Sequence, residues 1–224
     1  MEKFIKPRLL TPSGQSHKKF WQAAGLCALT AAIFFLPFYL LDGGFFHYAG
    51  DFNSQQISFY RYMNGFVKGA GYPDSAFAGA PRNTFSWATD LGSGVMNAYS
   101  FYLYGSPFFW LSVLLPQSWL PYMMVPLLVL KFGVAGGGAY LYLRRYVKNA
   151  NYAVLGACLY ALSGFAVYNV FFNHFVDVVA LFPYLLWALD EAIYEDRHGL
   201  FAFWVAVNLL NNYFFFAGQA VFLI

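Results

Sequence analysis

The chain has 224 residues, of which 60% are hydrophobic, 23% aromatic and only 10% charged, and its formal net charge is +3. Soluble globular proteins carry about 25% charged residues, so this composition excludes a soluble globule and indicates a membrane protein. The small net charge also excludes the broad basic surface that nucleic-acid binding requires.

Residues 1–19 are polar and basic and contain Pro7 and Pro12, which predicts a cytoplasmic tail with little fixed structure. The apolar run that follows, 20–41, is about 20 residues long and can cross the roughly 30 Å hydrocarbon core. No small-residue cleavage motif follows it, so we interpret it as a retained span rather than a signal peptide. Since basic residues favour the cytoplasmic side, the segment after Leu41 is expected on the outer face.

The segment 42–116 is predicted to form a long extracytoplasmic loop. Apolar residues at helical spacing predict an amphipathic helix on the membrane surface, and they are Phe59, Tyr60, Met63, Phe66 and Val67. Asn53 and Gln56 are spaced as an N-terminal capping pair, and Gly69 is expected to end the helix. The stretch 72–99 is rich in Gly, Pro, Ser and Asn and is expected to be irregular.

The apolar run 101–116 is interrupted by Gly105-Ser106-Pro107. If this run crossed the membrane, the next span would carry the basic turn 144–148 to the outer face, which contradicts the positive-inside rule. Its unbroken part is also shorter than about 14 residues. We therefore expect a re-entrant or interfacial segment here.

The rest of the chain predicts further membrane spans that alternate in direction, and they are 121–143, 152–172, 175–194 and 200–222. Together with 20–41 they make about five spans. The predicted fold is an all-α polytopic membrane protein, with a tail at 1–19 and one transmembrane domain over 20–224. In this arrangement Asn173 to Asp177 are expected to emerge on the outer side, the side of Asp51.

Several short motifs occur along the chain, and they are Gly50-Asp51 with Gln55, Asp90-Leu91-Gly92-Ser93-Gly94, Gly105-Ser106-Pro107-Phe108, Gly138-Ala139-Tyr140-Leu141-Tyr142-Leu143-Arg144 and Leu159-Tyr160-Ala161-Leu162-Ser163-Gly164-Phe165. In their order and spacing these motifs resemble the YfhO family of bacterial multispanning membrane proteins, which is grouped with the GT-C glycosyltransferases. The likeness covers nearly the whole chain from about residue 30. Family members are longer, so this chain resembles their N-terminal portion.

The resemblance implies a GT-C-like fold and an enzyme of the bacterial cell membrane. Such an enzyme takes a sugar from a polyprenyl-phosphate donor and transfers it on the outer face to a cell-envelope acceptor, such as teichoic acid or a glycolipid. Two other classes stay open: a transporter or flippase of lipid-linked sugars, and a noncatalytic partner in envelope assembly. The expected partners are the donor, the acceptor and membrane lipids; no cofactor follows from the motifs, although a divalent cation is an open alternative.

Asp51 is the predicted catalytic residue. An inverting transferase needs a carboxylate that accepts the proton of the acceptor hydroxyl, and GT-C enzymes are similar in placing an acidic residue in the first outer loop. The alternative is that Asp51 caps the following helix. Asp90 is a predicted substrate-binding residue, because the glycines after it let the backbone approach a ligand, or else a simple turn residue. The spacing of Asp51 and Asp90 does not itself indicate a metal.

Lys131 lies near the middle of the span 121–143, where a charge is costly and needs a partner. Asp177 is expected near the outer end of its own span, about 15 Å away along the membrane normal at 1.5 Å of rise per residue. We therefore expect Lys131 to bind the phosphate of the lipid donor. The alternatives are a buried pair with Asp177 and snorkelling of the lysine toward an interface.

The remaining predicted substrate-binding residues are His174, Asp177, Gln55 and Arg61. His174 and Asp177 are three residues apart and share a helical face, where they either orient a substrate or form a structural cap. One histidine and one aspartate are too few ligands for a metal site. Gln55 belongs to the Gly50-Asp51 motif, and Arg61 contacts either phosphate or lipid head groups.

The charge distribution predicts that 42–99 lies outside the cell and 144–150 inside it. Single cysteines at Ser75 and Asn149, in a chain that lacks Cys27 and Cys158, test this with a membrane-impermeant thiol reagent. In intact cells we expect labelling at position 75 and none at position 149. The reverse pattern would invert the topology.

Overall fold

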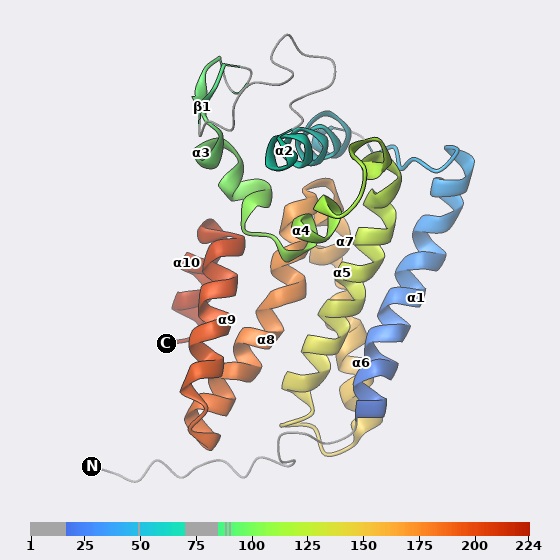
Figure 1. Cartoon of the computed structure of the whole chain (residues 1–224). Coiled ribbons are helices and arrows are strands. Elements are labelled where there is room, and N and C mark those ends of the chain that lie inside the picture. The colour runs from blue at the N-terminus through green and yellow to red at the C-terminus, as the bar shows by residue number, and fades with distance from the viewer. Residues whose placement is uncertain (1–16, 49, 70–84, 88, 90) are drawn as a thin grey trace.

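The computed structural model describes residues 17–48, 50–69, 85–87, 89 and 91–224, and it is almost entirely helical over these residues. The long helices form a bundle whose axes run roughly in one direction (Figure 1). They are α1 (His17–Leu41), α5 (Leu120–Leu143), α6 (Ala150–Ala161), α8 (Asn173–Glu195) and α9 (His198–Asn211). The prediction of an all-α membrane protein is therefore confirmed.

Among the described residues, three segments are long and apolar enough to cross a membrane: His17–Leu41, Gln117–Leu143 and Ala150–Phe171. They correspond to the first three predicted spans. The fourth predicted span corresponds to α8, whose 23 residues are also long enough to cross, although the helix carries Asp177, Asp190 and Glu191. Helix α8 packs along α5, so α5 shields these carboxylates from lipid.

The predicted span 200–222 is wrong as a single helix. The backbone is extended at Asn212, which separates α9 from α10 (Tyr213–Phe222). The Asn212 side chain accepts a hydrogen bond from the backbone N–H of Phe215 and so caps α10, at an O···N distance of 3.1 Å. The chain turns at this point, and α10 folds back along the bundle (Figure 1).

The predicted span 152–172 is also interrupted. Helix α6 ends at Ala161, and two short helices follow it, α7 (Gly164–Tyr168) and the 3₁₀ helix η4 (Asn169–Phe171). Ser163 makes the break, because its hydroxyl accepts a hydrogen bond from the backbone N–H of Ala166 and caps α7. A hydroxyl that caps a new helix competes with continuation of the old one.

The outer segments lie across one end of the bundle, at the end opposite to the start of α1 and the turn after α5 (Figure 1). These segments begin with the π-helix η1 (Phe52–Ile57) and α2 (Ser58–Lys68), and continue through β1 (Phe85–Ser86), β2 (Ser93–Gly94), α3 (Val95–Tyr99), the π-helix η2 (Ser100–Tyr104), α4 (Pro107–Val113) and the 3₁₀ helix η3 (Gln117–Trp119). The stretch expected to be irregular thus contains a small antiparallel hairpin and α3. None of these described segments is long enough to cross a membrane, as expected for 101–116.

The predicted ends of the amphipathic helix are half right. Gly69 ends α2 in the left-handed conformation, with φ of 70°, as glycine allows. The predicted capping pair is wrong, because η1 continues directly into α2 without a break. Asn53 instead accepts a hydrogen bond from the backbone N–H of Tyr48, and Gln56 points into the protein interior.

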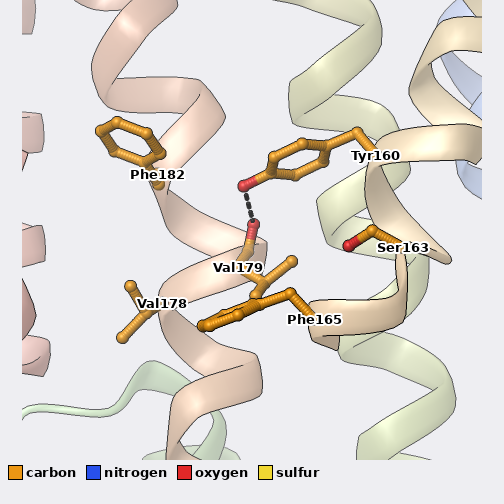
Figure 2. A pocket seen from close by; sticks show the side chains of 6 residues that line it. All are labelled: Tyr160, Ser163, Phe165, Val178, Val179 and Phe182. Atoms are coloured by element: carbon orange, nitrogen blue, oxygen red, sulfur yellow. Dashed lines mark hydrogen bonds between the residues drawn. The ribbon is translucent and has the colours of Figure 1, made fainter. Parts of the chain in front are cut away.

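A proline in α8 explains one contact between α6 and α8. Pro183 has no N–H, so the carbonyl of Val179, four residues earlier, lacks its helical hydrogen-bond partner. The Tyr160 hydroxyl of α6 donates to that carbonyl at 3.0 Å, as Figure 2 shows. A cavity of about 260 Å³ lies beside this bond, between Ser163, Phe165 and Phe182.

We predict that Tyr160→Phe lowers the free energy of unfolding by about 1 kcal/mol, because it leaves a buried carbonyl without a donor. In a Pro183→Ala background the loss is smaller, because the new N–H at position 183 bonds the Val179 carbonyl. Unfolding by SDS titration in mixed micelles, followed by circular dichroism, measures both values. Tyr168→Phe, at an exposed tyrosine, is the control. Equal losses in both backgrounds would contradict the proposed role of Tyr160.

Candidate functional site

A buried ion pair joins α5 to α8. The Lys131 ammonium lies 2.5 Å from the Asp177 carboxylate, and the side chains are 0% and 1% exposed. Both groups are far from water, where isolated charges cost several kcal/mol. The pair is stable there only if further hydrogen bonds offset the free-energy cost of burying the two charges.

Three oxygen atoms surround the Lys131 ammonium, as many as it has N–H donors. Besides Asp177 it donates to the side-chain oxygen of Asn173 at 2.7 Å and to the Asn173 backbone carbonyl at 3.1 Å. The ring of Phe108 lies 5.6 Å from the ammonium and adds a cation–π contact. In this arrangement the lysine has no donor left for a ligand.

Asp177 is held from a second side by the start of α4. The Ser106 hydroxyl donates to the Asp177 carboxylate at 2.5 Å, and the same oxygen caps α4 by accepting from the N–H of Phe109. Gly105, just before Ser106, has no room for a side chain, because a Cβ there would collide with the backbone carbonyl of Leu210 at the end of α9. The segment 100–113 therefore enters the bundle between α8 and α9 and contacts the ion pair directly.

The expectation that Lys131 lacks a carboxylate at matching depth is wrong. That expectation rested on the assumption that all spans begin at the same depth in the membrane. Lys131 lies about 16 Å along α5 from its first residue, whereas Asp177 lies about 6 Å along α8. Their contact therefore places the start of α8 about 10 Å deeper than the start of α5. The outer segments fill the space above α8.

His174 and Asp177 do not emerge on the outer side, as the sequence suggested. Both are buried, because η1 and η2 cover the start of α8. The His174 ring lies 3.4 Å from the Gln56 side-chain oxygen of η1, and the rings of Phe101 and Tyr102 in η2 pack edge-on against it. The predicted pair is thus part of the interior.

These residues form one polar cluster that links η1, α2, α4, α5 and α8. We define it as Lys131, Asp177, Ser106, Asn173, Tyr60, His174 and Gln56. Within the described part of the chain, five of its buried atoms have no hydrogen-bond partner, and they are Gln56 Nε2, Tyr60 Oη, Asn173 Nδ2, His174 Nε2 and Asp177 Oδ1, the last of which contacts the Lys131 ammonium as an ion pair. An unpaired buried polar group costs about 1–3 kcal/mol. In folded proteins such atoms are satisfied by ordered water or by a polar ligand group.

Tyr60 contributes a hydroxyl that stays protonated. Burial, and in addition the nearby Asp177 carboxylate, raises the pKa of Tyr60 well above its usual value. The hydroxyl lies beside the side chains of Ser106 and Asn173. It is therefore available as a donor over the physiological pH range.

Asp51 lies at the N-terminal end of η1, on the outer side of the cluster. Its side chain makes no capping hydrogen bond, so the structure does not support the helix-cap alternative. Gly50 has a positive φ of 72°, and a Cβ there would collide with the ring of Phe171. The backbone before Asp51 is thereby fixed, while its carboxylate is half-buried and has no hydrogen bond or ion pair to any described residue.

The other predicted site residues are less closely tied to the cluster. Gln55 is half-buried on η1, next to the inward-facing Gln56. Arg61 follows Tyr60 on α2, and its backbone carbonyl accepts a hydrogen bond from the Gln117 side chain at 2.8 Å. Asp90 lies outside the described residues. Among those residues, no group of three or more His, Cys, Asp or Glu side chains gathers in a way that could hold a metal ion.

A match to a known family accompanies this geometry. The family model described as bacterial membrane protein YfhO matches residues 26–222, which is most of the chain. The chain belongs to the YfhO family. It is accordingly a multi-pass protein of the bacterial cell membrane. No curated protein and no solved structure matches it.

Four members of the cluster in this YfhO-family chain were not predicted from the sequence as polar site residues: Ser106, Asn173, Gln56 and the hydroxyl of Tyr60. Ser106 had a readable signal, since a serine before a proline is typical of a helix start. The sequence held no signal for Gln56, because the π-helical geometry of η1 changes which residues face inward relative to an α-helix. Asn173 acts partly through its backbone carbonyl, which any residue provides.

A second group of charges joins the opposite ends of α5 and α8. Arg145 forms an ion pair with Glu191, and its Nε lies 3.5 Å from Asp190. Arg197 lies 3.3 Å from the other oxygen of Glu191, and the Tyr146 hydroxyl donates to Asp190 at 2.7 Å. The pKa of Tyr146 is raised, mainly by burial and to a smaller extent by this hydrogen bond. These contacts lie beside the basic turn and are separate from the polar cluster.

We predict that Lys131→Met lowers the free energy of unfolding by about 3–5 kcal/mol, because it leaves Asp177 as an unpaired buried charge. The double variant Lys131→Met/Asp177→Asn recovers most of this loss, since no charge then stays in the interior. SDS titration of the purified chain measures both. Lys148→Met, at an exposed lysine in the turn after α5, is the control. A Lys131→Met chain as stable as the parent would show that the ion pair does not form.

Proposed function

We propose that this chain is the N-terminal part of a GT-C-like membrane glycosyltransferase. It would move a sugar from a polyprenyl-phosphate donor to a cell-envelope acceptor, such as teichoic acid or a glycolipid, on the outer face of the membrane. The observation that carries the proposal is Asp51, a half-buried carboxylate without a capping hydrogen bond on the segment that covers the polar cluster. Membership in the YfhO family supports the same class of reaction through the resemblance to GT-C enzymes.

Asp51 is proposed to act as the general base. Its carboxylate accepts the proton of the acceptor hydroxyl while the hydroxyl oxygen attacks the anomeric carbon of the donor sugar, and the polyprenyl phosphate leaves. A base in this role must be free to form a new hydrogen bond, and Asp51 forms none to the described residues. The fixed backbone at Gly50 would hold it in place.

The polar cluster is proposed to bind the polar part of the donor. Gln56 and Asn173 offer unused N–H donors, and Tyr60 offers a hydroxyl. Sugar hydroxyls and phosphate oxygens accept such bonds. A phosphate that contacts Lys131 would have to displace Asp177 or Asn173, since these occupy all of its donors. Gln55, Arg61 and Asp90 stay predicted contacts to the substrates.

A transporter or flippase of lipid-linked sugars is the second candidate. The specific observation in its favour is the pair of buried charges at membrane depth beside the interrupted helix α6–α7, since transporters place their sites on discontinuous helices near the midplane. This function would not need Asp51 as a base. The fate of Asp51 variants therefore separates the two candidates.

We predict that Asp51→Asn lowers sugar transfer at least about a hundredfold, the usual effect of removing a general base, without loss of the folded chain. The measurement is the sugar decoration of the cell envelope, by mass spectrometry, in cells that lack the gene and carry the full-length parent or variant gene. Asp42→Asn is a matched control, because Asp42 lies in the same outer loop and contacts His47 at the surface. Undiminished decoration with Asp51→Asn would remove the transferase proposal in this form.

The same cells discriminate between transfer and transport. If Asp51→Asn blocks transfer alone, the lipid-linked sugar still reaches the outer leaflet, where an added lectin or oxidant can modify it. If Lys131→Met/Asp177→Asn blocks transport, the lipid-linked sugar is retained on the inner leaflet. A strain in which neither variant changes envelope sugars would support the noncatalytic assembly role.

A further inference from the structure

A second site, separate from the polar cluster, lies between the cytoplasmic half of α1 and the middle of α5. It is a cavity of about 460 Å³ lined almost entirely by apolar groups. Its walls include Trp21, Gly25 and Ala28 of α1, Leu130 and Gly133 of α5, and Tyr184 of α8. Neither the family match nor the proposed transfer reaction assigns a role to this surface.

The shape of the groove follows from small side chains. Gly133 approaches α1 closely, since a Cβ there would lie 3.2 Å from the Cβ of Ala28. A Cβ on Gly25, by contrast, would meet no atom within 4 Å, so the groove is open above this residue. The rear wall is firm, because the Tyr184 hydroxyl donates to the Val134 carbonyl at 3.1 Å and its ring stacks on Trp204.

A positive charge without a partner among the described residues lies at the cytoplasmic end of the groove. Lys18, Trp21, Gly25 and Ala28 follow one another at spacings of three, four and three residues, so they share one face of α1. Lys18 is exposed and has no hydrogen bond or ion pair to any described residue. Its neighbour Lys19 is on another face and donates to Gln22 and to Asn151 of α6, at 2.8 and 2.7 Å.

We propose that this groove binds an anionic phospholipid of the cytoplasmic leaflet, with one acyl chain along Gly25 and the headgroup phosphate at Lys18. A chain of methylene groups matches the long apolar surface, and the ammonium complements the phosphate. Trp21 is 69% exposed between the two regions, at the level where aromatic side chains meet lipid headgroups. A zwitterionic headgroup carries the same phosphate but adds a cation that Lys18 repels, so the charge of Lys18 favours a lipid with a net negative charge.

The test uses the full chain in phosphatidylcholine vesicles that contain a small fraction of a lipid with a photoactivatable acyl chain. The probe lipid is either phosphatidylglycerol or phosphatidylcholine, and mass spectrometry maps the labelled residues. In the parent, the phosphatidylglycerol probe should label the groove about fivefold more than the phosphatidylcholine probe. Labelling at Leu155 and Leu159, which are exposed on α6, should not distinguish the probes.

Two variants separate the contributions of charge and shape. Lys18→Gln should bring the ratio of the two probes close to one, whereas Lys19→Gln, the same charge change at a paired lysine, should leave it near the parent value. Gly25→Leu should remove groove labelling by both probes and leave Leu155 labelled, which shows that α6 still contacts lipid. Equal labelling of the parent by both probes, an equal effect of the two lysine variants, or groove labelling that persists in Gly25→Leu would overturn the proposal.

Discussion

The buried ion pair of Lys131 and Asp177 is the contact on which the arrangement of this molecule depends. Each charge alone would be intolerable at that depth, and the pair is acceptable only because Ser106 and Asn173 complete its hydrogen bonds. Ser106 belongs to an outer segment, whereas the other three residues belong to the bundle. Because the buried ion pair needs the hydrogen bond from Ser106, the outer segment that carries Ser106 packs into the bundle, on the inner side of the segment that carries Asp51.

Two ion pairs also fix how α5 and α8 lie beside each other. Both helices run from the outer end to the cytoplasmic end, and 14 residues separate Lys131 from Arg145, as 14 residues separate Asp177 from Glu191. The same interval along both helices places the pairs about 21 Å apart. A slip of one helix by one turn would break both pairs at once. Helices α5 and α8 are thus a rigid unit, and the interrupted helices α6–α7 and α9–α10 are where the fold bends.

The sequence predicted the helical class, the first spans and the short outer segments well, because apolar length and periodicity are local properties. It failed where the answer depends on how elements stack. The stagger of α8 against α5 moved Asp177 beside Lys131, and no pattern within either helix carries that information. The breaks at Ser163 and Asn212 are intermediate cases: each polar residue was visible, but an apolar run of sufficient length outweighed it. The catalytic role of Asp51 stays a prediction, and it rests on a local signal, a carboxylate after a glycine at the end of a span.

The hydrogen bond between Tyr160 and the Val179 carbonyl couples the evolution of two positions, 160 and 183. Pro183 creates the need for the hydroxyl, and the hydroxyl has no comparable task once an N–H returns at position 183. If Pro183 is replaced first, Tyr160 can then be replaced without loss of a needed hydrogen bond. If Tyr160 is replaced first, the intermediate protein has a Val179 carbonyl without a hydrogen-bond donor inside the membrane. We therefore expect that replacement of Pro183 precedes replacement of Tyr160 in evolution.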